Sequence, residues 1–308
     1  AEAKRWTVTP AAADVGDHSL TITVRDAEGA ELGRAATTLK IIAADAGADR
    51  SIRLLIVGDS LTHATTYSNE VARLLSLPDN PRWEMLGTHK PSKVAPGVAH
   101  EGYGGWTWQR FAAHYEPNPD GTYRKRSSPF VYSGDGEDGK PVLDPARYFD
   151  EHFDGRRADF VTFLLGINDC FSADPDDPAA IDARIETMFT HADTLIDAFR
   201  KAAPEAELGI CLTTPPNARE SGFEANYKGR YHRWGWKRIQ HRLVEREIER
   251  FQGREDEKLF IVPTQLNLDP ESGYPTNNGV HPNTFGYNQI GASIYAWLKA
   301  RMEVRAGE

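Results

Sequence analysis

The sequence predicts an α/β protein in which a mainly parallel sheet is covered by helices on both faces and preceded by a short all-β region. From residue 50 onward, apolar strand-like runs alternate with helical patterns, whereas residues 1–45 contain only strand-like patterns. Strand–helix alternation with continuously apolar strands is typical of a parallel sheet buried on both faces. A length of 308 residues allows one large domain with an appendage.

The N-terminal region is expected to contribute β-strands alone. Residues 6–9, 19–24 and 36–42 alternate apolar and polar side chains, and Asp26-Ala27-Glu28-Gly29 is a hairpin-turn signal. These strands resemble part of an immunoglobulin-like sandwich, but a whole sandwich needs about 100 residues. We therefore predict an immunoglobulin-like fragment that packs as a small β appendage on the main domain. The predicted division is an appendage with its linker, 1–48, and a main domain, 49–308.

The main domain is expected to contain five strands and five longer helices. The strands are predicted at 52–57, 83–87, 159–165, 207–212 and 259–262, and the helices near 66–76, 106–115, 179–202, 231–252 and 286–303. Asp177 followed by Pro178 is a favourable start for the third helix. Two segments, 116–147 and 214–232, fit no regular element and are predicted to be long loops that shape a site.

Charge and hydropathy exclude several classes of partner. The net charge is −9 and there is no long basic run, so we expect no nucleic-acid partner. No stretch of 18 apolar residues occurs, so no membrane span is expected. The acidic, turn-rich segments do not match a full calcium loop, and no metal site is predicted.

Two residues far apart in the chain are candidates for a nucleophile and its base. Ser60, in Gly58-Asp59-Ser60-Leu61, directly follows the first predicted strand of the main domain, and His281 lies in Val280-His281-Pro282. A serine hydroxyl is a weak nucleophile at neutral pH and needs a base within hydrogen-bond reach. Alone, Ser60 would be read as a helix cap and His281 as a structural histidine; together they predict a catalytic pair.

Two further segments follow strand ends and contain candidate oxyanion donors. Gly105 lies in Gly104-Gly105-Trp106-Thr107, where glycine lets a backbone N–H approach a substrate oxygen closely. Asn168 follows the third strand, in Leu165-Gly166-Ile167-Asn168-Asp169. A side-chain amide in such a position contributes about 10²–10³ in kcat. Asp169 is expected to support the Asn168 loop.

Taken together and in this order, the four segments resemble the blocks of the SGNH/GDSL hydrolase superfamily, and the resemblance covers residues 52–300. It implies a three-layer α/β/α, flavodoxin-like domain and ester hydrolysis through an acyl-enzyme. It implies that Ser60 is the nucleophile, that His281 is the general base, and that the oxyanion hole consists of the Ser60 N–H, the Gly105 N–H and the Asn168 side chain. It implies no metal or organic cofactor.

The chain departs from the superfamily pattern three residues before the histidine, where Asn278 replaces the usual aspartate. In serine proteases, exchanging the acid for an amide lowers kcat by about 10⁴. Three explanations stay open from the sequence. Asn278 or a backbone carbonyl orients His281; a carboxylate from elsewhere, with Asp269 and Glu271 nearest upstream, takes its place; or the site is impaired.

The predicted substrate is a short-chain ester, most simply an acetyl ester, on a carbohydrate. Trp106, Asp59 and Tyr227 are the predicted substrate contacts, and at least one of Trp106 and Trp108 is expected at the surface, because aromatic faces stack on sugar rings. Neither long loop offers an aliphatic run for a long acyl chain. The alternative functions are a glycan-binding protein with impaired catalysis and, less favoured, an acyltransferase. The chain begins at Ala1 rather than Met, and by analogy with glycan enzymes we expect a secreted or periplasmic protein without its signal segment.

Overall fold

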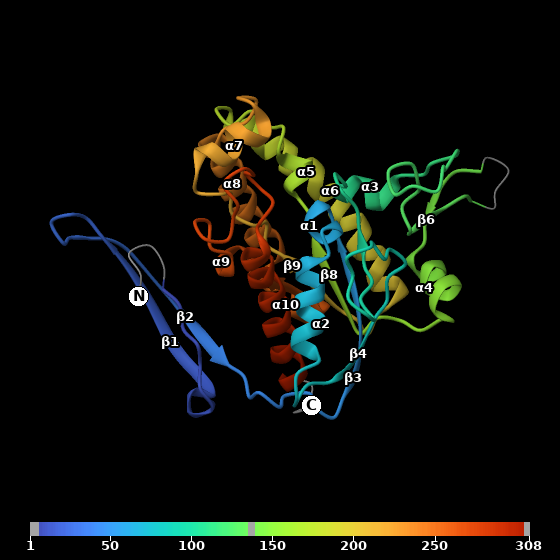
Figure 1. Ribbon diagram of the computed structural model, residues 1–308, viewed down its shortest axis with the longest axis horizontal. Helices are drawn as coiled ribbons and strands as arrows, with labels where there is room; N and C mark the ends of the chain where they lie inside the picture. The colour runs from blue at the N-terminus through green and yellow to red at the C-terminus, as the bar shows by residue number, and fades with distance from the viewer. Residues whose placement is uncertain (1–5, 135–138, 305–308) are drawn as a thin grey trace.

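The computed structural model describes residues 6–134 and 139–304, and a parallel sheet forms its centre (Figure 1). The strand order is β10-β9-β8-β3-β4, and the short β5 also pairs with β3. In chain order this is the 2-1-3-4-5 arrangement of flavodoxin-like folds. All five predicted strands of the main domain are present: β3 (Ser51–Gly58), β4 (Arg82–Met85), β8 (Phe160–Leu164), β9 (Glu207–Cys211) and β10 (Leu259–Val262), with β5 at Glu101–Gly102.

Helices cover both faces of this sheet and complete three layers. On one face α2 (Thr66–Leu75) packs against α10 (Thr284–Val304). The other face is covered by α3 (Trp108–Ala113), α4 (Pro145–Phe153), α6 (Pro178–Ala202) and α8 (Arg233–Phe251). The three central strands β3, β8 and β9 are buried almost throughout, as their apolar sequences predict.

The long helix α6 illustrates how the sequence specifies these elements. Its N-cap Asp177 accepts hydrogen bonds from the backbone N–H groups of Ala179 and Ala180, and Pro178 occupies the first helical position. Eight apolar side chains of the helix are buried, and these face the core. The predicted start of α6 at Asp177 and Pro178 is therefore confirmed.

Several short elements were not predicted. They are α1 (Ser60–His63), α4, α5 (Ile167–Cys170), α7 (Glu220–Tyr227), α9 (Thr264–Asn267), the 3₁₀ turns at Ala12–Asp14 and Glu255–Glu257, β5, and the strand pair β6 (Val131–Tyr132) and β7 (Val142–Leu143). The segment 116–147, predicted to be a long loop, contains β6, β7 and the start of α4. The segment 214–232, predicted to be irregular throughout, thus contains a helix. Among the described residues, no helix has the length and apolar content needed to cross a membrane.

The N-terminal region is a two-stranded antiparallel hairpin of β1 (Gly16–Arg25) and β2 (Glu31–Ile41). The predicted turn is confirmed, because the Asp26 N–H donates to the Ala30 carbonyl at the hairpin tip. The predicted strand at 6–9 is wrong, since these residues form no strand.

The predicted packing of the β appendage on the main domain is also wrong. Almost every residue of β1 and β2 is exposed, including Ile22, Val24 and Leu32, and Figure 1 shows the hairpin extending away from the other elements. Two strands present too little apolar surface to form a core of their own. The linker is anchored at α10, where Lys299 Nζ donates to the Ala44 carbonyl at 2.7 Å.

Candidate active site

The end of β3 places a serine hydroxyl against an imidazole. Ser60 begins α1 immediately after β3, and its Oγ lies 2.8 Å from His281 Nε2. Asp59 caps α1 by accepting the Leu61 N–H at 2.9 Å. The strand must end in glycine, because a Cβ at Gly58 would lie 2.0 Å from Thr62 Oγ1. The predicted pair from opposite ends of the chain therefore meets within hydrogen-bond distance.

Asn278 holds the imidazole in the tautomer that a general base requires. Its Oδ1 accepts the backbone N–H groups of Val280 and His281, at 3.0 and 2.9 Å, and lies 3.2 Å from His281 Nδ1. Two backbone donors identify this atom as the amide oxygen, so the proton of the hydrogen bond must be on Nδ1. Nε2 is then unprotonated and accepts the hydrogen bond of the Ser60 hydroxyl.

Burial favours the neutral form of this histidine. Desolvation lowers the pKa of His281 below its usual value of 6.5. No carboxylate stabilises the imidazolium, because the imidazole nitrogens contact Ser60 and Asn278 and no other side chain of the described chain. The hypothesis that Asp269 or Glu271 replaces the missing aspartate is therefore wrong; the Asp269 carboxylate instead accepts the Glu271 N–H at 2.8 Å.

A buried asparagine that the sequence analysis missed positions the histidine loop. Asn217 donates from Nδ2 to the carbonyls of Pro275 and Asn278, at 2.8 and 2.9 Å, and its N–H donates to the Gly279 carbonyl. Its side chain is fully buried. These bonds fix the backbone from which Asn278 reaches His281, and no motif of the sequence signals them.

The three predicted oxyanion donors come from three different strand ends. Gly105 has a φ of +78°, is exposed, and would have no atom within 4 Å of an added Cβ. Within the described chain, neither the Ser60 N–H nor the Gly105 N–H donates a hydrogen bond. Asn168, on α5, donates from Nδ2 to Asp59 Oδ2 at 3.2 Å and to the Trp106 carbonyl at 3.0 Å. Both amide hydrogens of Asn168 thus have protein partners.

Three carboxyl groups are buried around these loops without a cation beside them in the described chain. Burial raises the pKa of Asp59 and of Asp169 to about 7, and that of Glu247 on α8 to about 8. Asp169 supports its loop as predicted, because its carboxylate accepts the Trp108 N–H at 3.1 Å. Glu247, which the sequence analysis missed, accepts the N–H and the hydroxyl of Thr213.

The predicted substrate contact Trp106 and its neighbour Trp108 both point into the protein. The Trp106 ring is fully buried and packs against Tyr103 and Phe111, and Trp108 is buried against Phe163. The expectation that one of these tryptophans lies at the surface is wrong, because the loop after β5 turns both rings into the core. Trp106 contributes its backbone carbonyl instead.

The other two predicted contacts differ from each other. Asp59 is buried and reaches the site through Asn168 rather than through an exposed surface. Tyr227, at the end of α7, is partly buried and packs against Phe171, which directly follows α5. It remains a predicted substrate contact.

A histidine cluster that the sequence analysis missed lies next to the serine. His63, three residues after Ser60 on α1, bonds through Nδ1 to His89 Nε2 at 3.0 Å, and its ring lies 4.5 Å from that of Tyr123. Burial, with the neighbouring charges, lowers the pKa of His89 to about 4 and that of His100 to about 3. Across the described residues, no group of three or more histidine, cysteine, aspartate or glutamate side chains is arranged to hold a metal ion.

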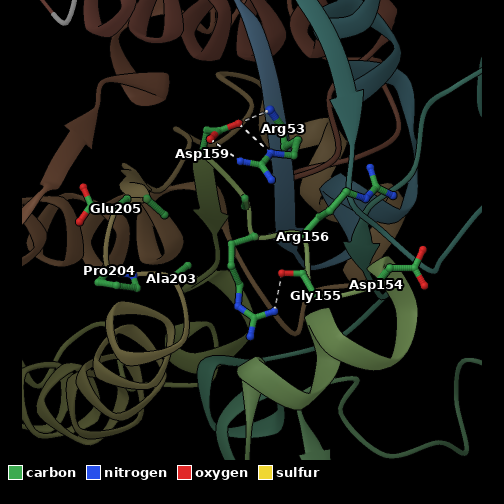
Figure 2. Close-up of a pocket in the computed structure, with 11 residues that line it drawn as sticks. Arg53, Asp154, Gly155, Arg156, Asp159, Ala203, Pro204 and Glu205 are labelled. Carbon is green, nitrogen blue, oxygen red and sulfur yellow. Dashed lines mark hydrogen bonds and ion pairs between the residues drawn. The ribbon is translucent and has the colours of Figure 1, made fainter.

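A surface pocket lies at the opposite end of the sheet, and the side chains that line it are not arranged as a nucleophile and a base. Figure 2 shows it beside Arg53 and Asp159, and it also extends to residues 154–158 and 203–206, which precede β8 and β9. Its arginines are bound to carboxylates: Arg53 to Asp159, Arg156 to Glu84 and Arg157 to Asp150. We therefore place the candidate active site at the carboxyl end of the sheet, around Ser60.

Comparison with known proteins shows the fold. No family model matches the chain, and no curated protein matches its sequence. Among solved structures it is similar to a Clostridium thermocellum family 3 carbohydrate esterase, with a TM-score of 0.53 and 18% identity over 83% of this chain and 100% of that chain. It is also similar to a family 3 carbohydrate esterase from Talaromyces cellulolyticus, with a TM-score of 0.48 and 16% identity over 82% and 98% of the two chains. The chain has the SGNH/GDSL hydrolase fold.

Proposed function

We propose that this protein is a secreted or periplasmic serine esterase that removes short acyl groups, acetyl above all, from carbohydrate. The observation that carries the proposal is the chain of contacts from Ser60 Oγ to His281 Nε2 and from His281 Nδ1 to Asn278 Oδ1. It supplies a nucleophile, a base in the correct tautomer, and an orienting group for that base.

The reaction follows from these positions. His281 Nε2 takes the hydroxyl proton of Ser60 as Oγ attacks the acyl carbon, and then delivers it to the departing sugar oxygen. A water molecule, deprotonated by the same nitrogen, attacks the acyl-serine, releases acetate and restores the hydroxyl. Each step needs His281 neutral at its start, and its lowered pKa favours that form.

The oxyanion would be held by the free N–H groups of Ser60 and Gly105 and by Asn168. For Asn168 to donate to the substrate, one of its two present bonds must be exchanged. The bond to Asp59 is the longer, at 3.2 Å against 3.0 Å for Trp106. We propose that it is the bond exchanged, so Asp59 holds the amide in place until substrate arrives.

The exchange of aspartate for Asn278 weakens this machinery less than it would in a protease. There the amide selects the wrong tautomer and kcat falls by about 10⁴. Here two backbone N–H groups hold the amide oxygen toward the imidazole, so the tautomer is correct. What is lost is the negative charge that would stabilise the imidazolium.

The carbohydrate part of the proposal is supported by the surroundings. Phe171, Tyr227 and Tyr231 form a partly exposed aromatic cluster after Asn168, with ring centroids 4.4–5.3 Å apart. Aromatic faces with polar edges suit sugar rings. The two similar structures reported above are described as carbohydrate esterases, and the first of them shares the fold of this chain.

The test is acetate release from p-nitrophenyl acetate and from acetylated xylo-oligosaccharides. Ser60→Ala should lower kcat by about 10⁴-fold or more. Asn278→Asp should raise the pKa of His281 and move the acidic limb of the kcat/KM profile to higher pH, because a carboxylate stabilises the imidazolium. Turnover that is equal in wild type and Ser60→Ala would refute the proposal.

A glycan-binding protein without catalysis is the second candidate. It is favoured by the two protein partners of the Asn168 amide and by the missing aspartate. It predicts saturable binding of an oligosaccharide with no Ser60-dependent acetate release from any acetylated form of it.

A further inference from the structure

Three arginines stack on aromatic rings next to the turn that contains Gly105, two of them on the residues that begin and end this turn. The Arg126 guanidinium lies 4.8 Å from the Tyr103 ring centroid, and that of Arg110 lies 5.0 Å from the Trp106 ring. Arg124 lies 5.7 Å from the ring of Tyr123. The Arg126 and Arg110 guanidinium groups thus contact Tyr103 and Trp106, the residues on either side of Gly104 and Gly105.

Tyr123 connects this group to the nucleophile. Its ring contacts that of His63, on the same short helix as Ser60, and its hydroxyl would lie 3.5 Å from a Cβ added at Gly104. The first long loop therefore brings its Arg124 to the side of the active site, rather than to a remote surface.

Within the part of the chain that the structure describes, none of these three arginines has a carboxylate partner. Among the described residues, their polar side-chain contacts are the Arg124 carbonyl for Arg110, the Tyr123 hydroxyl for Arg124 and the Ser127 carbonyl for Arg126. By contrast, most arginines of the helices around the sheet form ion pairs, among them Arg147, Arg242, Arg246, Arg250 and Arg254.

An uncompensated cluster of this kind is unexpected in a chain of net charge −9. His89 and His114 do not add to the charge, because burial lowers their pKa values, and Arg126 lowers that of His89 and Arg110 that of His114 further. The positive potential beside Gly105 therefore comes from guanidinium groups, which bind planar oxyanions such as carboxylate and sulfate through paired hydrogen bonds.

From this arrangement we propose that the substrate is an anionic glycan, whose acid groups bind Arg124, Arg126 and Arg110 while the ester lies at Ser60. The proposal rests on the proposed esterase function and adds to it the substrate class. The acid group belongs to a sugar near the acylated one, because Arg126 and Arg110 contact the residues on either side of Gly104 and Gly105. Carboxylate and sulfate share the chemistry that this surface recognises.

Binding of oligosaccharides that carry no ester tests this without catalysis. By calorimetry, the wild-type protein is titrated with tetragalacturonate, with a sulfated galactan tetrasaccharide and with neutral xylotetraose. At least one charged probe should bind, more weakly as salt increases, and the neutral probe should bind more weakly than it. Preference between the two charged probes identifies the acid group.

Variants then assign the binding to the arginines. Arg124→Gln should weaken the Kd for the charged probe about fivefold, the size expected for one exposed ion pair, and Arg124→Gln with Arg126→Gln should weaken it further. Arg124→Lys, which keeps the charge, should lose less. Arg82→Gln is the matched control, because Arg82 is exposed at the amino end of β4 and bonds the Ser51 hydroxyl.

Equal affinity for neutral and charged probes, no binding of either charged probe, or unchanged affinity in the double variant would overturn the anionic-glycan proposal. Failure of the esterase function has a different signature, namely charged-probe binding without any Ser60-dependent acetate release. The two results are obtained independently.

Discussion

The two ends of the central sheet handle charge in opposite ways. At the amino end, acids and bases are joined: Arg53 forms a two-point ion pair with Asp159, and Arg156 and Arg157 are likewise bound to carboxylates. At the carboxyl end they are separate. Asp59 and Glu247 are buried there, and Asp169 is largely buried, without a cation beside them in the described chain. Three arginines near the Gly105 turn have no carboxylate partner among the described residues.

Of the two ends, as far as the structure describes them, the carboxyl end is the one with acids and bases that are not paired with each other. Ion pairs at the amino end satisfy both partners and leave nothing to bind a ligand. Carboxyl groups that are buried without a cation, as at the carboxyl end, cost stability. Such groups are characteristic of functional sites. The predictions below test this contrast. Substitutions at the carboxyl end should change activity or the pH dependence of stability, and the substitution at the amino end should change stability alone.

Of three substitutions that compare the two ends, Asn168→Ala is expected to have the largest effect. Removing the amide should lower kcat for acetyl esters by about 10²–10³-fold with a small change in KM, because the lost donor acts mainly in the transition state. Steady-state kinetics measures the split, and urea unfolding reports any loss of the fold. Asn69→Ala is the matched control, since Asn69 also bonds two backbone groups, of Lys93 and Ala95, outside the site. A decrease smaller than about fivefold would exclude Asn168 as an oxyanion donor.

The sequence predicts the frame of this site well, because the frame depends on local patterns. Continuous apolar runs identify the five strands, and residues that follow strand ends identify Ser60 and Asn168 as neighbours in space. The sequence also identifies His281, because Val280-His281-Pro282 is a recognisable pattern. No carboxylate from upstream is needed to orient His281, since Asn278 itself fills that position.

What the sequence misses depends on contacts between distant segments. The Trp106 ring points inward because it packs against Tyr103 and Phe111, and no motif in the sequence signals this packing. In the sequence Glu247 looks like an ordinary polar residue of a helix. Its role depends on Thr213, which follows β9 and contacts it only in the folded chain. The alternating pattern of the hairpin predicts a buried face, but no element among the described residues covers that face.

The next largest effect is expected in the pH dependence of the free energy of unfolding. Burial raises the pKa of Glu247 from 4.5 to about 8, so this group binds a proton more tightly in the folded protein than in the unfolded chain. The stability linked to this proton is fully present below pH 4.5 and is lost as pH rises through 8. Compared with Glu247→Gln, wild type should lose at least about 2 kcal/mol of unfolding free energy between pH 5 and pH 9.

Urea unfolding at the two pH values measures this difference. Glu249→Gln, a substitution of an exposed acid on the same helix, controls for the change of net charge. An equal pH dependence in wild type and Glu247→Gln would show that Glu247 keeps its charge in the folded protein. Burial of this carboxyl group would then cost the carboxyl end of the sheet less stability than its raised pKa implies.

The smallest effect is expected at the amino end, with Arg53→Gln. Arg53 donates to Asp159 from Nε at 3.1 Å and from Nη2 at 2.9 Å, and both side chains are partly exposed, at 36% and 26%. Solvent screening limits such a pair, so the free energy of unfolding should fall by about 1 kcal/mol or less, and less still at high salt. A double-mutant cycle with Asp159→Asn isolates the pair from the hydrogen bond that Asp159 accepts from the Arg53 N–H. Because Ser60 lies at the other end of β3, kcat should stay within twofold of wild type. A much larger loss of kcat at unchanged stability would mean that the two ends of the sheet are coupled, and the separation of stability from activity drawn above would not hold.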